Sequence, residues 1–404
     1  MPAADLGQAL YHAIDLFNAR EVQTFAVPPA TFIGAGAIAR LGQSAAERGY
    51  RRVFIAIDGF LLEQGLADNL FRSLQRHGVA AETYRYPGGE PDSDTVEAAA
   101  RQLAAAACDA IIAFGGGSVL DTAKAIAALA AHPGMRVADL AAAAALPNGR
   151  MPLLLAPTTA GTGSEATNIT VITDSASGVK QAIAQAALLP DLAVLDACLT
   201  LAVPAPLTAA TGIDALTHAI EAYLARGANP LTQALAHRAI TLIGRALPIA
   251  VGQGHQLAAR QDMMLGSYLA GMAFSNAGLG LVHAMAHQIG ARYHIPHGVA
   301  NAVLLPSVLR FNRLVCAPRY RELAHALCGE TLDADGLIAA VARLIIDIGL
   351  PGSLRLPGVE PEHFAALADA ALDDACLAGN PRDASREQII DIYRHAWQRQ
   401  APAC

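Results

Sequence analysis

Hydrophobic and polar positions follow two alternating patterns in the first half of the chain. Short, almost unbroken apolar runs occupy residues 52–58, 109–114, 151–156 and 192–195. Between them, stretches such as 61–77 and 95–107 place apolar residues at helical spacing. Strands that helices cover on both faces have this texture. The first half is therefore predicted to be α/β, with a parallel sheet.

The strand pattern disappears after Pro204 and Pro206, and from there to residue 397 the sequence is helical in period. Glycine and proline separate the successive helical stretches. We predict an α/β domain at residues 23–203, followed by an all-α domain at residues 204–404.

A short amphipathic stretch lies in the remaining N-terminal extension, residues 1–22. Within residues 5–17, one helical face carries Leu6, Leu10, Ala13, Ile14 and Phe17. Two interpretations stay open for this stretch. It is either a helix packed on its own protein or a neighbouring subunit, or a docking peptide for a larger assembly.

Composition narrows the class of protein. Of 404 residues, 53% are hydrophobic and only 16% are charged, against about 25% in a typical soluble protein. The net charge of -7 disfavours nucleic acid and anionic membrane surfaces as partners. No unbroken apolar run of about 18 residues and no signal peptide is present. Six scattered cysteines without a CxxC pair are typical of reduced thiols in a cytoplasmic protein.

Two polar loops follow predicted strands. Gly115, Gly116 and Gly117 with Ser118 open a helix, whose unpaired N–H groups form a ready anion site. The second loop, residues 157–165, offers four hydroxyl groups and two glycines. Neither loop matches GxGxxG or a P-loop, and each alone is also explained by a tight turn or a helix cap. Together, after successive strands of one sheet, they favour a dinucleotide crevice.

Asp58 ends the first predicted strand of that sheet. A carboxylate there accepts hydrogen bonds from a ribose hydroxyl and repels a 2′-phosphate, which favours NAD over NADP. A solvated aspartate at a strand end is the simpler alternative.

Histidines and one aspartate recur at helical spacing in the second half. Asp214 and His218 are four residues apart, as are His283 and His287, and His297 follows at a Pro-Gly bend. A single histidine here is most often a satisfied core residue, but unpaired buried polar groups are costly and a metal removes that cost. The set predicts a divalent metal site suited to Fe²⁺ or Zn²⁺, with Mn²⁺ and Co²⁺ as further candidates.

These motifs resemble the iron-containing (group III) alcohol dehydrogenase family over residues 23–398. The resemblance rests on residues 115–124, 157–165, 211–223, 278–287 and 296–298. Within the family, residues 24–29, 89–91 and 294–301 look most like the alcohol dehydrogenases of ethanolamine utilisation. The family often has a second proline where this chain has Ser93.

The resemblance implies roles for individual residues. It implies an α/β dinucleotide-binding domain followed by an all-α metal-binding domain, with metal ligands Asp214, His218, His283 and His297. His287 would serve in proton transfer or substrate placement without binding the metal. The cofactor would contact Asp58, Gly115, Gly116, Gly117, Ser118, Asp121, Thr158, Thr159, Thr162 and Lys180.

The implied activity is a metal-dependent, NAD(H)-linked interconversion of a short-chain primary alcohol and its aldehyde, with ethanol and acetaldehyde favoured. Fe²⁺ is the first candidate metal and Zn²⁺ the second. The alternatives are a small diol or hydroxy acid as substrate, of the lactaldehyde or 4-hydroxybutyrate type, or a non-catalytic cofactor-binding subunit. A phosphorylated substrate is disfavoured because Arg292 is the only cation in the metal-site motifs.

The resemblance also implies partners and a location. We expect a homodimer or a higher homo-oligomer in the cytoplasm. Residues 5–17 add the hypothesis of association with the shell proteins of a bacterial microcompartment.

Overall fold

The structure is a computed structural model that describes residues 22–399, and its backbone divides into two compact units. The sheet unit consists of residues 26–159 and 163–202. The helical unit consists of the described residues 22–25, 160–162 and 203–399. The amphipathic stretch predicted at residues 5–17 lies outside the described residues.

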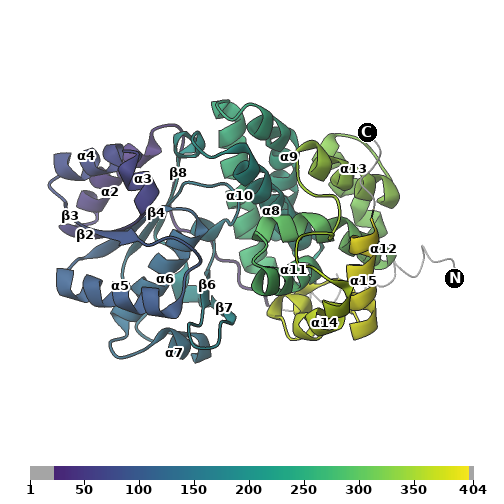
Figure 1. Ribbon diagram of the computed structural model, residues 1–404. Helices are drawn as coiled ribbons and strands as arrows, with labels where there is room; N and C mark the ends of the chain where they lie inside the picture. Colours follow the sequence, from purple (N-terminus) through teal and green to yellow (C-terminus); the bar gives the residue numbers. More distant parts are fainter. Residues whose placement is uncertain (1–21, 400–404) are drawn as a thin grey trace. The chain divides into compact units, whose positions relative to one another are not determined.

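A six-stranded, fully parallel sheet forms the centre of the sheet unit (Figure 1), in the order β1-β8-β5-β4-β2-β3. The strands are β1 (Thr31–Ile33), β2 (Arg52–Asp58), β3 (Ala80–Tyr86), β4 (Ala110–Gly115), β5 (Leu153–Pro157) and β8 (Leu192–Leu195). Every residue of β4, β5 and β8 is buried, which explains their unbroken apolar sequence. The predicted fold class is confirmed.

Helices cover both faces of this sheet (Figure 1). One face carries α2 (Leu41–Glu47), α3 (Gly59–Glu63) and α4 (Asp68–Arg76), and the other carries α5 (Ser93–Ala106), α6 (Gly117–Ala131) and α7 (Val137–Ala142). The helical pattern at residues 61–77 predicted one helix, but the structure has a break between α3 and α4. Gly65 lies in the break with a φ of 68°, a left-handed conformation that ends α3.

The order in which the chain visits the strands creates a switch point. From β2 the chain passes to β3 on one side, and it then returns to form β4 on the other side of β2. In open parallel sheets, ligands bind at the carboxyl ends of the strands beside such a reversal. Those ends carry Asp58 on β2 and Gly115 on β4. A separate antiparallel pair, β6 (Ile169–Thr173) and β7 (Lys180–Ala184), was not predicted.

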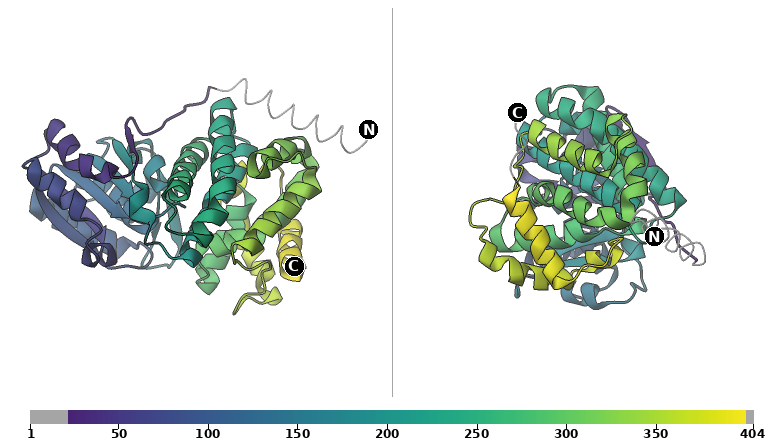
Figure 2. Two further views of the ribbon diagram at one scale, coloured as in Figure 1. Left: turned by 90° about the horizontal axis from the view of Figure 1, so that it is seen from above. Right: turned by 90° about the vertical axis from the view of Figure 1, so that its right-hand side faces the viewer.

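The helical unit is built around one almost completely buried helix. Its helices are α8 (Ala205–Leu224), α9 (Pro230–Gly252), α10 (Leu257–Ala277), α11 (Leu281–Tyr293), α12 (His297–Cys328), α13 (Ala334–Asp347), α14 (Phe364–Leu372) and α15 (Arg386–Gln398). From Thr208 to Leu224, all but one residue of α8 is buried. It packs against α9, α10 and α12 (Figure 2), so its polar side chains lie in the core of the unit.

Two of these helices are long and apolar enough to cross a membrane. By length and composition alone, α9 and α12 could each span a membrane. Helices α10 and α11, which meet at an angle of 105°, would form a third span if they were counted as one. In α12, 72% of the most apolar stretch is buried inside the protein, against 44% in α9. The apolar character of α12 therefore corresponds mainly to its place in the core.

Candidate active site

One face of α8 carries three ionisable side chains. Asp214, His218 and Glu221 are spaced at i, i+4 and i+7, which places them on the same side of the helix. Each is at least 94% buried, since their exposed fractions are 4%, 6% and 6%. Charged and imidazole groups inside an apolar core need partners from other elements.

Those partners come from the first turns of α11 and α12. His283 lies in the first turn of α11, and His297 is the first residue of α12. The start of α12 approaches α8 closely, because a Cβ at Gly298 would lie 1.9 Å from the carbonyl oxygen of Ala210. Only glycine permits this contact, which holds His297 beside Asp214.

Three imidazole nitrogens surround one carboxylate oxygen. Asp214 Oδ1 lies 3.9 Å from His218 Nε2, 3.8 Å from His283 Nε2 and 3.4 Å from His297 Nε2. The four ligand atoms lie within 4.8 Å of one another. The structure thus brings together all four residues that the resemblance named as ligands.

A second layer of side chains orients these groups. Glu221 accepts hydrogen bonds from His283 Nδ1 at 2.6 Å and from the backbone N–H groups of Gly280 and Val282 at 3.1 and 2.7 Å. Asn301 Nδ2 donates to Asp214 Oδ1 at 2.7 Å. Sequence reasoning missed both residues. Glu221 could have been found, because it lies on the Asp214 face of α8 one turn beyond His218.

The electrostatics of the cluster favour positive charge. Burial opposes ionisation of Asp214, but His218 and His297 outweigh it and hold the pKa of this carboxyl below its ordinary value. Burial lowers the pKa of His218 to about 4 and that of His297 well below 6.5. Burial also opposes charge on His283, yet the carboxylates of Asp214 and Glu221 raise its pKa to about 9. The cluster is therefore most stable with one positive charge placed between the carboxylate and the imidazoles.

The donor set fits a divalent metal. Because His283 Nδ1 donates to Glu221, its Nε2 is the nitrogen that faces Asp214 Oδ1, at 3.8 Å. The raised pKa of His283 places a proton on this Nε2, and a metal cation can replace that proton between the nitrogen and the carboxylate. Three imidazole nitrogens and one carboxylate oxygen suit Fe²⁺ or Zn²⁺, and a carboxylate hydrogen-bonded to a ligand histidine is typical of such sites.

His287 lies beside this cluster with its own carboxylate. Its ring stacks on His297 with centroids 5.4 Å apart, and its Nδ1 lies 2.8 Å from Asp374 Oδ2. The backbone N–H of Cys376 donates to the other oxygen of Asp374 at 2.9 Å. His287, Asp374 and Cys376 form a second group with metal-ligand geometry. Sequence reasoning missed Asp374, because nothing in the local pattern links it to a histidine 87 residues earlier.

In the sheet unit, the glycine loop and the second polar loop lie side by side. Thr158 N donates to the carbonyl oxygen of Gly115 at 2.9 Å, and a Cβ at Gly116 would lie 3.6 Å from Thr159. Gly115 has no room for a side chain, because its Cβ would lie 2.6 Å from Val119 in the first turn of α6. Gly117 and Ser118 begin α6. The N-terminus of α6 therefore starts directly at the end of β4.

The other predicted cofactor residues are distributed differently. Asp58 Oδ1 accepts from Phe60 N at 2.8 Å and caps α3. Asp121 accepts from Ser164 Oγ and Val171 N, so both its oxygens have partners within the sheet unit. On β7, Lys180 Nζ donates to Glu90 at 2.6 Å. Thr162 belongs to the helical unit.

Two ionisable residues buried in the sheet unit were not predicted. Lys124 Nζ donates three hydrogen bonds of 2.8 Å, to Thr167 O, Thr167 Oγ1 and Ile169 O. Burial lowers its pKa to about 8 and raises the pKa of Glu165 to about 7. Lys124 lies on α6, within the motif at residues 115–124, and Glu165 is the last residue of the motif at residues 157–165.

The chain matches two family descriptions that together cover most of its length. "Iron-containing alcohol dehydrogenase" matches residues 28–197, and "Fe-containing alcohol dehydrogenase family, C-terminal" matches residues 208–397.

Individual proteins agree with this assignment. The chain is 52% identical over 393 residues to the probable alcohol dehydrogenase EutG of Salmonella typhimurium, covering 97% of this chain and 99% of that protein. The crystal structure of a 1,3-propanediol oxidoreductase has a TM-score of 0.90 at 38% identity and covers 93% of this chain and 100% of its own. Sulfoacetaldehyde reductase from Bifidobacterium kashiwanohense, solved with NAD⁺, has a TM-score of 0.87 at 28% identity, covering 94% and 100%. The chain therefore belongs to the iron-containing alcohol dehydrogenase family.

Proposed function

We propose that this enzyme interconverts a short-chain primary alcohol and its aldehyde, ethanol and acetaldehyde above all, with NAD(H) and a divalent metal. Fe²⁺ is the first candidate and Zn²⁺ the second. The observation that carries the proposal is the arrangement of three histidine nitrogens, each within 3.9 Å of one oxygen of Asp214. Such a set, backed by a buried carboxylate, is suited to holding a cation.

Apart from Thr162, the residues that would hold NAD lie in the sheet unit, and those that would hold the metal lie in the helical unit. The metal ligands would be Asp214, His218, His283 and His297. NAD would contact Asp58, Gly115, Gly116, Gly117, Ser118, Thr158, Thr159, Thr162 and Lys180, while Asp121 holds the surrounding chain in place. When bound, the cation supplies a Lewis acid for the substrate oxygen, and the nicotinamide accepts or donates hydride.

Specific side chains orient and protonate the reacting groups. Glu221 accepts from His283 Nδ1 and so turns its Nε2 toward the metal, whose binding would displace the proton from that nitrogen. Asp374 accepts from His287 Nδ1 in the same way and leaves His287 Nε2 free to exchange a proton. His287 would pass the alcohol proton to solvent. Its side chain is 28% exposed, which is enough for contact with water.

Preference for NAD over NADP is supported by Asp58. This carboxylate ends β2 beside the switch point of the sheet, where it would accept from a ribose hydroxyl and repel a 2′-phosphate. The NAD⁺-bound sulfoacetaldehyde reductase of the same fold supports the same choice.

A small diol is the second candidate substrate. The similarity to a 1,3-propanediol oxidoreductase, with a TM-score of 0.90, favours a diol over a hydroxy acid. Ethanol is placed first because of the 52% identity to the probable alcohol dehydrogenase EutG.

The deciding experiment is metal analysis of the purified protein beside a substrate screen. Apo protein is reloaded with Fe²⁺ or Zn²⁺, and NADH oxidation is measured with C2–C4 aldehydes, 3-hydroxypropanal and lactaldehyde. We expect about one metal per chain and the highest kcat/KM with acetaldehyde. A higher kcat/KM with 3-hydroxypropanal would replace ethanol by the diol. Full activity without metal would refute the metal-dependent mechanism.

Association with a microcompartment is proposed for the N-terminal extension. Deletion of residues 1–20 should abolish co-sedimentation with shell proteins without changing turnover. Unchanged co-sedimentation would leave the segment a purely structural role. A homodimer or higher homo-oligomer is expected by light scattering during size-exclusion chromatography.

A further inference from the structure

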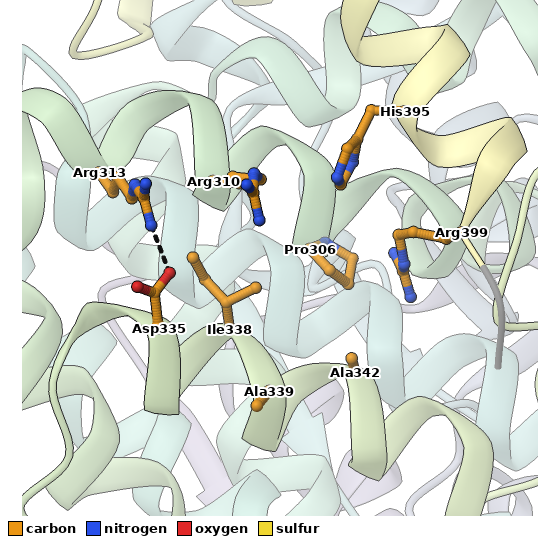
Figure 3. A pocket seen from close by; sticks show the side chains of 9 residues that line it. All are labelled: Pro306, Arg310, Arg313, Asp335, Ile338, Ala339, Ala342, His395 and Arg399. Carbon is orange, nitrogen blue, oxygen red and sulfur yellow. Dashed lines mark hydrogen bonds and ion pairs between the residues drawn. The ribbon is translucent and has the colours of Figure 1, made fainter. Parts of the chain in front are cut away.

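A cavity lies in the helical unit, and none of the proposed metal ligands lines it. It has a volume of about 450 Å³, within the range of about 300–1,000 Å³ usual for small-molecule sites. Three elements form its walls, α12, α13 and the end of α15 (Figure 3). Its lining residues are Pro306, Arg310, Arg313, Asp335, Ile338, Ala339, Ala342, His395 and Arg399.

Positive charge dominates this lining. Arg310 and Arg313 stand one turn apart on α12, while His395 and Arg399 reach toward the same helix from α15 and the residue after it (Figure 3). The only carboxylate of the lining, Asp335, forms an ion pair with Arg313. No described residue forms an ion pair with Arg310 or Arg399. Among residues 22–399, the cavity therefore holds two guanidinium groups without counter-ions, together with one imidazole.

Unlike the exposed Arg310, Arg399 is partly buried. Its Nη2 is buried and has no hydrogen-bond partner among the described residues, while Nη1 contacts the carbonyl oxygen of Val303 at 3.4 Å. A buried guanidinium N–H without an acceptor is unfavourable. Burial lowers the pKa of His395, and Arg310 and Arg399 lower it further. All three groups would gain from an anion placed among them.

The opposite side of the cavity is apolar. Ile338, Ala339 and Ala342 on α13 face Pro306 of α12 across the cavity (Figure 3). An inorganic anion alone would leave the apolar side of the cavity exposed to water. A ligand with an oxyanion at one end and a small apolar body at the other would use both sides.

We propose that this cavity binds a small phosphate monoester. The phosphate oxygens would accept hydrogen bonds from Arg310 and pair with the positive charge of Arg399, and the organic group would lie against Ile338 and Pro306. Guanidinium groups bind phosphate through paired N–H donors, which makes arginine the usual residue for this task. The inference does not depend on the proposed catalytic activity, because binding is measured without turnover.

The test uses phenyl phosphate, whose dianion and ring represent the two halves of the ligand. Binding to the metal-loaded enzyme is followed by calorimetry at fixed ionic strength and with saturating NAD, which blocks the cofactor site. We expect saturable 1:1 binding, at least about tenfold weaker in Arg310→Gln and in Arg399→Gln. Arg321→Gln, on the exposed side of the same helix, is the matched control and should bind like the wild type.

Three results would overturn the proposal. The first is no binding to the wild type up to about 10 mM phenyl phosphate. The second is equal affinity in the wild type and Arg310→Gln, which would place the ligand elsewhere, for example at the metal. The third is equal affinity for inorganic phosphate, which would remove the apolar part of the ligand. Arg310 is exposed, so its variants test binding without disturbing the core.

Discussion

The helical unit and the sheet unit use different atoms to hold charged groups. In the helical unit, the candidate binding groups are side chains: Asp214 and three histidines converge, and Glu221 accepts a hydrogen bond from one of those histidines. In the sheet unit, the predicted binding groups are mainly backbone N–H groups at the start of α6, brought to the end of β4 by glycines. Removing one side chain should therefore disable the first site, whereas adding one should damage the second.

The largest expected effect follows loss of a side chain in the helical unit. His283→Ala removes a proposed ligand that is 99% buried and takes from the buried carboxylates of Asp214 and Glu221 the imidazole that lies between them. We expect metal content near zero, turnover reduced at least about a thousand-fold and unfolding free energy reduced by about 3 kcal/mol. NAD affinity should not change.

Metal analysis, steady-state kinetics and NAD titration check this prediction. His325→Ala, which truncates an exposed histidine of α12, is the matched control. Normal turnover of a metal-free His283→Ala protein would contradict the assigned mechanism.

Glu221→Gln tests the second layer of the metal site. The amide keeps the size of the side chain but loses the charge that stabilises the His283 Nδ1–H bond of 2.6 Å. Mutation of a residue that hydrogen-bonds to a metal ligand typically weakens metal binding by about 10–100-fold. Chelator competition should therefore show weaker metal binding by that factor, with turnover restored at saturating metal. Unchanged metal affinity would restrict Glu221 to binding the backbone of α11.

Asp374→Asn should separate proton transfer from metal binding. The amide can donate to His287 Nδ1 and so favours the wrong tautomer of the imidazole. We expect kcat about 10–100-fold lower with metal content and KM for NAD unchanged. The adjacent Asp373→Asn, an exposed carboxylate, is the control. Loss of metal together with activity would instead make Asp374 part of the metal site.

Two neighbouring glycines test the backbone site of the sheet unit. An added Cβ at Gly115 would lie 2.6 Å from Val119, while at Gly116 it would meet Thr159 at an ordinary 3.6 Å. Gly115→Ala should lower unfolding free energy by about 1–3 kcal/mol and weaken NAD binding about tenfold. Gly116→Ala should weaken NAD binding similarly with unchanged stability, because only the approaching cofactor would meet the methyl group.

Urea unfolding and NAD titration measure the two quantities, and metal content serves as the internal control for both variants. Wild-type NAD affinity in Gly116→Ala would contradict its place in the cofactor site.

Strongly periodic or buried elements could be predicted from the sequence, and exposed ones could not. Strands β2 and β8 have the predicted bounds, since both are apolar and covered on both faces. The edge strand β3 was missed because most of its residues are half-buried or exposed and it lacks an apolar run. The antiparallel pair β6 and β7 was missed for the same reason.

The same distinction holds for the sites. Asp214 and His218 were found because helical spacing makes them neighbours in sequence as well as in space. Asp374 was not, because the contact with His287 depends on how the chain folds back after α14. Helical period also did not show that Asp121 would use both its oxygens within the protein. Long-range partners of this kind require the folded chain.

The last expected effect changes only the pH dependence of stability: it concerns a buried carboxyl of the sheet unit and distinguishes the two units by pH. Burial raises the pKa of Glu165 from 4.5 to about 7, so the folded protein retains a proton that the unfolded chain releases. Its contribution to stability is complete below about pH 4.5 and is lost as pH rises through about 7. In the helical unit, burial raises the pKa of Asp214, but the nearby imidazoles outweigh burial and lower it, so the sign of the pH dependence is the opposite.

Glu165→Gln removes this titration while keeping a neutral side chain of similar shape. Between pH 5 and pH 8 the wild type should lose up to about 3 kcal/mol more unfolding free energy than the variant, since each pKa unit corresponds to about 1.4 kcal/mol. Asp121, whose pKa burial also raises, titrates in both proteins and cancels in this difference. Urea unfolding at the two pH values is the measurement, with the exposed Glu47→Gln as control. Equal pH dependence in wild type and Glu165→Gln would contradict a raised pKa of Glu165 in the folded protein.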